Sequence, residues 1–215
     1  MYRKFVNLFV DGYVVNGILT KQYLVSQGVS ENVIFTGAMC ADSLHLAEKV
    51  KMIKPEERLF FKRELHIEKK EIIYLYVGRL ITLKGGAYLL DAWKEHILSH
   101  PNDHLLIVGE GPLFDDFVQG YGFMNSISFV GNIDYSRISE YYAVADVFVI
   151  PTLEDNWSLV VPEAMACGLP IACSVYNGCH PELVHEGKNG VLFDTLNKAS
   201  LLYALSYFHS VDLEL

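Results

Sequence analysis

The stretch DVFVIPTLEDNWSLVVPEAMACGLPIACS, residues 146–174, predicts a strand, a helix and a second strand in that order. Its two ends are short apolar runs with β-branched side chains, and the segment 159–167 between them has the length expected of a helix. A strand that is buried on both faces reads as a continuous apolar run, as these two do. The stretch therefore indicates one unit of a parallel sheet with a crossover helix.

The same alternation extends on both sides of this stretch, from residue 72 onward. We expect strands at 72–77, 104–108, 126–130, 146–150, 169–174 and 190–193. We expect helices at 84–99, 112–119, 135–143, 159–167 and 198–208. The predicted fold class is therefore α/β, with a doubly wound, Rossmann-like parallel sheet.

The composition of the 215 residues excludes several classes of protein. The net charge of −9 argues against binding to a nucleic-acid backbone, which needs clustered lysine and arginine. The spacing of the four cysteines matches no zinc ribbon or redox pair, so we expect reduced thiols in a cytoplasmic protein. No run of about 18 apolar residues is present, and we therefore expect no membrane span.

The first 70 residues have a different pattern from the rest. They contain an apolar segment at 9–17, a helix-like segment at 19–30, a short strand at 33–37 and a charged helical stretch at 54–65. One strand and one helix cannot bury enough apolar area by themselves. We therefore expect residues 1–36 to be the end of a domain whose other sheet partners lie elsewhere.

Basic residues and glycines follow the predicted strand 72–77, at the end where open parallel sheets bind their ligands. Gly78 and Arg79 come directly after the strand, and Lys84 lies five residues beyond Arg79. Glycine lets a ligand approach the backbone, the guanidinium is a fork for phosphate oxygens, and the ammonium is a point charge. A solvated surface loop explains the same residues equally well.

Two further turns follow the next strands. Gly111 precedes Pro112 after strand 104–108, and Asn132 and Ile133 follow strand 126–130. Both turns can be purely structural, because glycine and proline punctuate strand-to-helix connections. The second turn could also present backbone groups to a nucleobase.

The opening stretch places two acids next to an apolar helix. Free N–H groups at the start of this helix would favour a pyrophosphate over Trp157, Ser158 and Leu159. Glu163 lies one turn inside, and its carboxylate could accept a pair of ribose hydroxyl groups. Asp155, on the loop before the helix, could accept hydroxyl groups of a sugar beyond the phosphates. Both acids could equally be favourable charges near a helix N-terminus.

Taken together, these motifs resemble a known family. In order, the chain carries Gly-Arg-Leu with Lys-Gly downstream, Gly-Glu-Gly-Pro, a strand that ends in Pro, acid-x7-Glu-Ala-Met-Ala-x-Gly-Leu-Pro, and Asn-Gly. This ordered set, over about residues 72–195, resembles the retaining GT-B glycosyltransferases, the group 1 or sucrose- and glycogen-synthase-like family. In that family two Rossmann-like domains face each other, and the C-terminal one binds a nucleotide-sugar.

The resemblance implies roles for individual residues. Arg79 and Lys84 would hold the diphosphate and stabilise the leaving group, and Glu163 would bind the ribose. Asp155 would contact the transferred sugar, although the family more often has Glu there and neighbouring Glu154 is a rival. The implied nucleotide-binding residues are Gly78, Gly111, Asn132, Ile133, Trp157, Ser158, Leu159 and Glu163.

The resemblance also implies an organisation and a reaction. Residues 1–38 would be the end of the acceptor domain plus a linker, and 39–215 the C-terminal nucleotide-sugar-binding domain of an apparently truncated chain. The full-length enzyme would transfer a hexose from a UDP- or GDP-linked donor to a glycan or lipid-linked acceptor, with retention. No cofactor or metal is implied, and we expect a role in polysaccharide biosynthesis, in the cytoplasm or at the inner face of the membrane. The isolated fragment would be inactive.

Two other functions remain open. Departures from the family pattern at Asp155 and at Ser158, where many members have Gly, favour a non-catalytic nucleotide-sugar-binding or regulatory domain. A nucleotide-sugar epimerase of the same fold is the second alternative. Calorimetry with a panel of nucleotides would separate the first from an enzyme, because a degenerate domain need not bind any of them.

Overall fold

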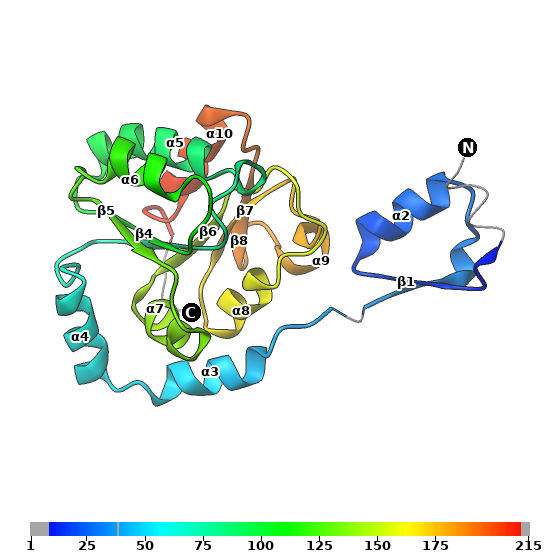
Figure 1. Cartoon of the computed structure of the whole chain (residues 1–215), viewed down its shortest axis with the longest axis horizontal. Coiled ribbons are helices and arrows are strands. Elements are labelled where there is room, and N and C mark those ends of the chain that lie inside the picture. Colours follow the sequence, from blue (N-terminus) through cyan, green and yellow to red (C-terminus); the bar gives the residue numbers. More distant parts are fainter. Residues whose placement is uncertain (1–8, 38, 212–215) are drawn as a thin grey trace.

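The computed structural model describes residues 9–37 and 39–211 of the chain. Its main body is an α/β domain of three layers, and a smaller unit on the amino-terminal side is joined to it by an extended segment (Figure 1). The motifs that follow the predicted strands from residue 72 onward all lie in the main body.

Six parallel strands form the central sheet in the order β5-β4-β3-β6-β7-β8. Their bounds are β3 Ile73–Val77, β4 His104–Val108, β5 Ile127–Gly131, β6 Val147–Ile150, β7 Ile171–Ser174 and β8 Gly190–Phe193. From β3 the chain proceeds to β4 and β5 on one side, and from β6 to β7 and β8 on the other. The strand order therefore reverses between β3 and β6, and their carboxyl ends open onto the same crevice.

Helices cover both faces of this sheet. One face packs against α5 (Gly86–Ser99), α6 (Phe114–Tyr121) and α10 (Lys198–Tyr207). The other packs against α3 (Ser43–Met52), α4 (Pro55–Glu64), α7 (Ile138–Val144) and α8 (Val160–Ala166). Successive residues of a strand point to opposite faces, so Tyr74 joins the first core and Leu75 the second. A short helix, α9 (His180–Leu183), lies between β7 and β8.

The predicted fold class is confirmed, and all six strands lie where the apolar runs place them, with ends displaced by at most two residues. The predicted helix 135–143 begins as a 3-10 turn, η4 (Tyr135–Arg137), before α7. Helix α3 is not among the predicted helices. It buries only Leu46 and Val50, so its apolar stripe is too narrow to indicate a helix from periodicity.

The loop after β3 is held against the end of β6. It contains a 3-10 turn, η3 (Thr82–Lys84), that ends at Gly85 with φ of 71°. A Cβ at Gly85 would collide with the carbonyl oxygen of Pro151, so a side chain is excluded both sterically and by the left-handed backbone. Leu83 O also accepts from the Leu153 N–H at 2.8 Å. The two loops on either side of the switch point therefore form one connected structure.

The smaller unit consists of β1 (Tyr13–Val15), α2 (Ile18–Ser26) and β2 (Ile34–Thr36), with the two strands parallel. It contacts the main body where Glu182 Oε2 accepts from the Ile18 N–H at 3.0 Å. A Cβ at Gly17 would lie 2.6 Å from the Trp157 ring, so the two units meet closely there. The predicted boundary between 1–38 and 39–215 stays a prediction, and residues 1–8 and Ala38 lie outside the described residues.

Two sequence expectations concern the whole chain. Within the described ranges, no helix is both long enough and apolar enough to cross a lipid bilayer. All four cysteines are free thiols.

Candidate functional site

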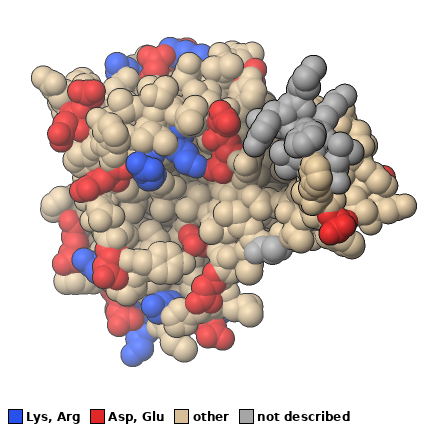
Figure 2. All heavy atoms as spheres, turned by 45° about the vertical axis from the view of Figure 1, so that its right-hand side comes forward, with Lys and Arg blue, Asp and Glu red and all other residues tan. Residues whose placement is uncertain are grey.

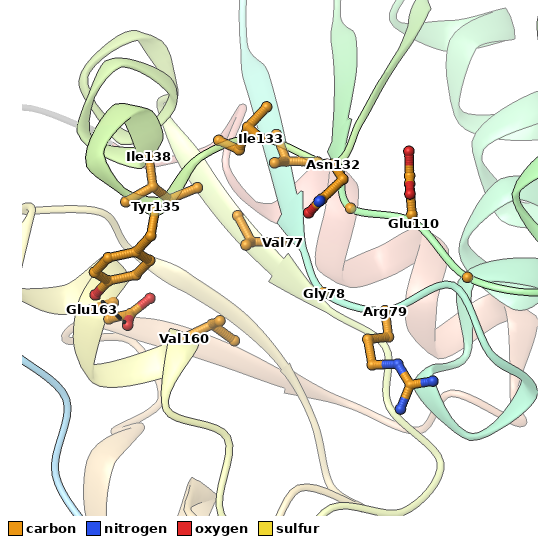
Figure 3. A pocket seen from close by; sticks show the side chains of 13 residues that line it. Val77, Gly78, Arg79, Glu110, Asn132, Ile133, Tyr135, Ile138, Val160 and Glu163 are labelled. Atoms are coloured by element: carbon orange, nitrogen blue, oxygen red, sulfur yellow. Dashed lines mark hydrogen bonds between the residues drawn. The ribbon is translucent and has the colours of Figure 1, made fainter.

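A cavity of about 570 Å³ lies at the carboxyl ends of β3, β4 and β5, between the loops that lead to α7 and α8 (Figure 3). Its volume falls in the range of small-molecule sites, and it lies beside the reversal of strand order, where open sheets bind ligands. Six of the predicted residues line it, namely Gly78, Arg79, Gly111, Asn132, Ile133 and Glu163.

Bare backbone forms one wall of the cavity, because glycines bring two turns together. Gly109 has φ of 134°, and a Cβ there would collide with the carbonyl oxygen of Gly78. A Cβ at Gly111 would lie 2.5 Å from the Leu80 carbonyl oxygen. The Leu80 N–H donates to Glu110 O at 2.9 Å, which fixes the two turns in register. This wall is open to close approach by a ligand.

A buried carboxylate, that of Glu163 in α8, occupies one end of the cavity. Only 7% of this residue is exposed. The Tyr135 hydroxyl donates to Oε1 at 2.9 Å, and the Tyr142 hydroxyl donates to Oε2 at 3.1 Å. Each carboxylate oxygen therefore has one hydroxyl partner, which offsets part of the cost of burying the acid.

The two tyrosines differ in how firmly they are held. Tyr142 is 1% exposed and belongs to the core, whereas Tyr135 is 57% exposed at the cavity mouth. Burial, followed by the hydrogen bond to Glu163, raises the pKa of Tyr135 to about 12. Burial and the Glu163 charge also raise the pKa of Tyr142 well above its usual value. Both hydroxyls therefore stay protonated donors near neutral pH, and only Tyr135 is free to turn into solvent.

The other end of the cavity carries a positive charge. Arg79, directly after β3, is exposed, and its guanidinium lies at the opposite end of the lining from Glu163 in the view of Figure 3. Val77 and Val160 lie between them in that view. The cavity thus combines an acceptor end, an apolar middle and a cationic end.

Lys84 and Asp155, which the sequence places near the same ligand, are not among the residues that line this cavity. They form an ion pair with each other at the neighbouring loops after β3 and β6. Asp155 also accepts from the Ser158 hydroxyl, and its Oδ1 accepts from the Trp157 N–H at 3.1 Å. Burial disfavours the ionised form of Asp155, but the hydrogen bonds from Lys84 and Ser158 outweigh it and lower the pKa of this carboxyl.

The remaining predicted residues surround this ion pair or lie beside it. Ser158 is buried, and its Oγ accepts from Asn177 Nδ2 at 2.9 Å. The ring N–H of Trp157 is buried with no hydrogen-bond partner among the described residues. Leu159 directly precedes α8, makes no side-chain capping hydrogen bond, and does not line the cavity. The loop therefore gives its Trp157 amide and its Ser158 hydroxyl to Asp155.

A second hollow, of about 630 Å³, lies between α2 and the loops after β6 and β7. Both Glu154 and Asp155 line it. Glu154 is exposed, whereas Asp155 is partly buried and engaged by its three donors. Both candidate acids thus line the same hollow, and the exposed Glu154 is freer than Asp155 to bind a further group.

The sequence reasoning did not assign the tyrosines that hold Glu163. A signal was present, because Tyr135 and Tyr142 are seven residues apart in a predicted helix and therefore share one face. Asn177 donates a hydrogen bond to the Ser158 hydroxyl and follows the strand β7. Its position after a strand is the sequence signal that could have indicated a role in the site.

Charged side chains are interspersed on the face shown in Figure 2, where acidic and basic groups alternate and no extended basic patch forms. On this face the arrangement agrees with the overall charge of −9.

Comparison with known proteins gives one family. The model of the family "Glycosyl transferases group 1" matches residues 57–210. An uncharacterized glycosyltransferase of Methanocaldococcus jannaschii is 32% identical over 153 residues, which cover 70% of this chain and 39% of that protein. Alpha-monoglucosyldiacylglycerol synthase of Acholeplasma laidlawii is 29% identical over 136 residues, which cover 62% of this chain and 34% of that protein. The chain thus matches only between 34% and 39% of the length of these two relatives.

Solved structures show the same fold. HepE of Anabaena in complex with UDP superposes with a TM-score of 0.79 at 19% identity, over 95% of this chain and 55% of that one. Sucrose-phosphate synthase of Thermosynechococcus elongatus gives a TM-score of 0.73 at 24% identity, over 97% of this chain and 52% of that one. The resemblance inferred from the motifs is confirmed for family and fold.

Proposed function

The chain belongs to the group 1 glycosyl transferases, and on that premise we propose that it is the donor-binding part of a glycosyltransferase, with a nucleotide-diphosphate sugar as its ligand. The observation that carries the proposal is the cavity with Glu163 at one end and Arg79 at the other. A nucleotide has ribose hydroxyls that a carboxylate can accept and phosphates that a guanidinium can bind, so its chemistry matches the two ends.

The order of groups along the cavity supports a definite orientation of the ligand. We place the ribose at Glu163, the base beside Asn132 and Ile133, and the diphosphate at Arg79 and the glycine turn. Gly78 and Gly111 line the cavity at that turn and carry no side chain, which suits the close approach of phosphate oxygens. HepE was solved with UDP, and uridine is therefore the first base to test, with guanosine as the alternative.

The sugar would then extend toward the Lys84–Asp155 pair. Arg79 and Lys84 are on the same loop after β3, and Asp155 is on the adjoining loop after β6, which adjoins β3 in the sheet. Asp155 would reach a sugar only by exchanging one of its present donors. Glu154 is exposed beside it and remains the rival for that role. Trp157 lies beside the same pair, and its buried ring N–H has no hydrogen-bond partner in the part of the chain that the structure describes.

For the whole enzyme we propose transfer of a hexose to a glycan or lipid-linked acceptor with retention of configuration, without a metal. Arg79 and Lys84 would supply the positive charge that stabilises the leaving diphosphate. The acceptor would bind outside the residues discussed here, and catalysis needs both reactants in one closed cleft. We therefore expect this chain to bind the donor and to transfer nothing alone.

Isothermal titration calorimetry of the 215-residue chain with UDP, GDP, ADP and UDP-glucose tests the proposal. We expect one nucleoside diphosphate to bind, and we expect Arg79→Ala and Glu163→Gln each to raise its Kd about tenfold or more, the typical loss for a hydrogen bond to a charged group. Arg63→Ala is the matched control, because Arg63 is exposed in α4 and lies away from the cavity.

Binding of none of these ligands to the wild-type chain would overturn the proposal. Equal affinity in Arg79→Ala, Glu163→Gln and the control would leave binding possible but remove this cavity as its place.

A further inference from the structure

A second buried acid lies at the opposite edge of the sheet, near the amino ends of β3 and β4. Asp103 is fully buried in the turn between α5 and β4. The Nε2 atoms of His96, in the last turn of α5, and of His209, just after α10, each lie 2.8 Å from its Oδ2. Two imidazoles from distant parts of the chain therefore converge on one carboxylate oxygen.

These three residues offer ligand atoms that all lie within 4.8 Å of one another. Across residues 9–37 and 39–211, no other group of three or more His, Cys, Asp or Glu side chains satisfies this condition. Imidazole nitrogen and carboxylate oxygen are ligands that zinc and related divalent ions accept. The donor set therefore has the composition of a transition-metal site.

Outer contacts orient two of the three ligands, whereas the second ring nitrogen of His96 has no hydrogen-bond partner among the described residues. The Ile72 N–H donates to the other Asp103 oxygen at 3.3 Å, and Glu71 Oε1 lies 3.6 Å from His209 Nδ1. Histidines that bind a metal through one nitrogen commonly direct the other at a carboxylate, which fixes the ring and raises its basicity. Glu71 is placed for that role toward His209.

Aromatic packing restrains the same rings. The His100 ring stacks on His209 with centroids 3.8 Å apart and on His96 at 4.7 Å, and Trp93 lies 5.0 Å from His96. The side chains of His96 and Asp103 have no exposed area, and that of His209 is 16% exposed. The rings are thus held in place, and His209 and His100 are each partly exposed.

We propose that His96, Asp103 and His209 bind one divalent ion of the zinc class. Three protein ligands leave the fourth position of a tetrahedral ion to a solvent molecule. A buried carboxylate is costly without a cation, and a divalent ion beside Asp103 would remove that cost. The ion would tie the end of α10 to the turn between α5 and β4, far along the sheet from the Glu163 cavity. The proposal does not depend on nucleotide binding.

The test uses the full chain without a histidine tag, first treated with a chelator and then dialysed. Zinc chloride is added in a calorimetric titration, and the melting temperature is measured with and without zinc. Cobalt chloride is added separately, because tetrahedral Co²⁺ absorbs visibly. We expect one ion per chain, a higher melting temperature with zinc, and a visible cobalt spectrum.

Two variants make the result specific. His209→Gln keeps a hydrogen-bond donor for Asp103 but loses the imidazole ligand, so the fold should persist while the Kd for zinc rises about tenfold or more. His185→Ala is the control, because His185 is exposed and outside the cluster. Absence of a zinc-dependent melting shift in the wild-type chain, or a wild-type Kd in His209→Gln, would overturn the proposal and leave the cluster as a hydrogen-bonded network alone.

Discussion

Glu163 and Asp103 are both buried acids at the ends of one sheet, but their partners differ in kind. Glu163 accepts from two phenol hydroxyls, one of which belongs to the exposed Tyr135 beside an open cavity. Asp103 accepts from two imidazoles that are stacked in place, and from a backbone N–H. Glu163 can therefore exchange a partner for a ligand hydroxyl, whereas every partner of Asp103 is fixed by packing. A carboxylate with an exchangeable partner is suited to reversible ligand binding, whereas one whose partners are fixed is suited to a structural role.

The largest difference should appear in stability. Asp103 accepts from the Ile72 N–H through one oxygen and from two imidazoles through the other. Because Asp103→Asn turns one of these acceptors into a donor, we expect the free energy of unfolding to fall by about 2–4 kcal/mol. Glu163→Gln should cost about 1 kcal/mol or less, because water in the cavity can replace the lost contacts. Urea unfolding of both variants and the wild-type chain, all with a chelator present, measures the two losses. Equal losses would contradict the distinction between the two acids.

Tyr135 tests whether a partner of Glu163 is exchangeable, on the premise that a nucleotide binds in the cavity. Its hydroxyl must leave Glu163 before a ribose hydroxyl can take its place, so Tyr135→Phe should tighten nucleotide binding by about 0.5–1.5 kcal/mol, roughly two- to tenfold in Kd. Tyr142→Phe is the matched variant and should give no such gain, because the buried Tyr142 hydroxyl would stay beside bound ribose. Calorimetry with UDP compares them. Weaker binding in Tyr135→Phe would instead make this hydroxyl a ligand contact.

Asp155 is a third acid, and its partner is the cation of Lys84. We expect the smallest change in stability for this acid. Because its folded pKa lies below its unfolded value near 3.9, its contacts stabilise the fold fully above that value. The contribution is lost as pH falls through the folded pKa. Between pH 7 and about pH 3, the wild-type chain should lose up to about 1 kcal/mol more unfolding free energy than Asp155→Asn. Urea unfolding of the two proteins at both pH values measures these losses. An equal loss in the two proteins would contradict the prediction.

Most of the fold could be predicted from the sequence, because strands buried on both faces leave continuous apolar runs such as 104–108. Turn glycines then located the sheet edge where Arg79 and Glu163 meet one cavity. Lys84 and Asp155 stay predicted ligand contacts, but the ion pair between them on adjoining loops could not be foreseen from their positions in the chain. Their partnership depends on the close contact of those loops, which is a tertiary feature.

The zinc-class cluster could not be predicted at all. His209 is 106 residues from Asp103, and no spacing rule joins a helix end to a turn across that distance. Metal-binding motifs are recognisable in a sequence when their ligands lie on one short segment, whereas here only His96 lies near Asp103 in the chain. Packing of α10 on α5 brings the third residue into place.

Trp157 joins the two units of the molecule to Asp155. Its ring lies against Gly17 at the start of α2, while its backbone N–H is bound by the Asp155 carboxylate. One residue therefore contacts the amino-terminal unit through its ring and the acid through its backbone. Replacing Trp157 would thus alter, in a single step, the contact between the two units and the surroundings of the side chain that we place nearest the sugar.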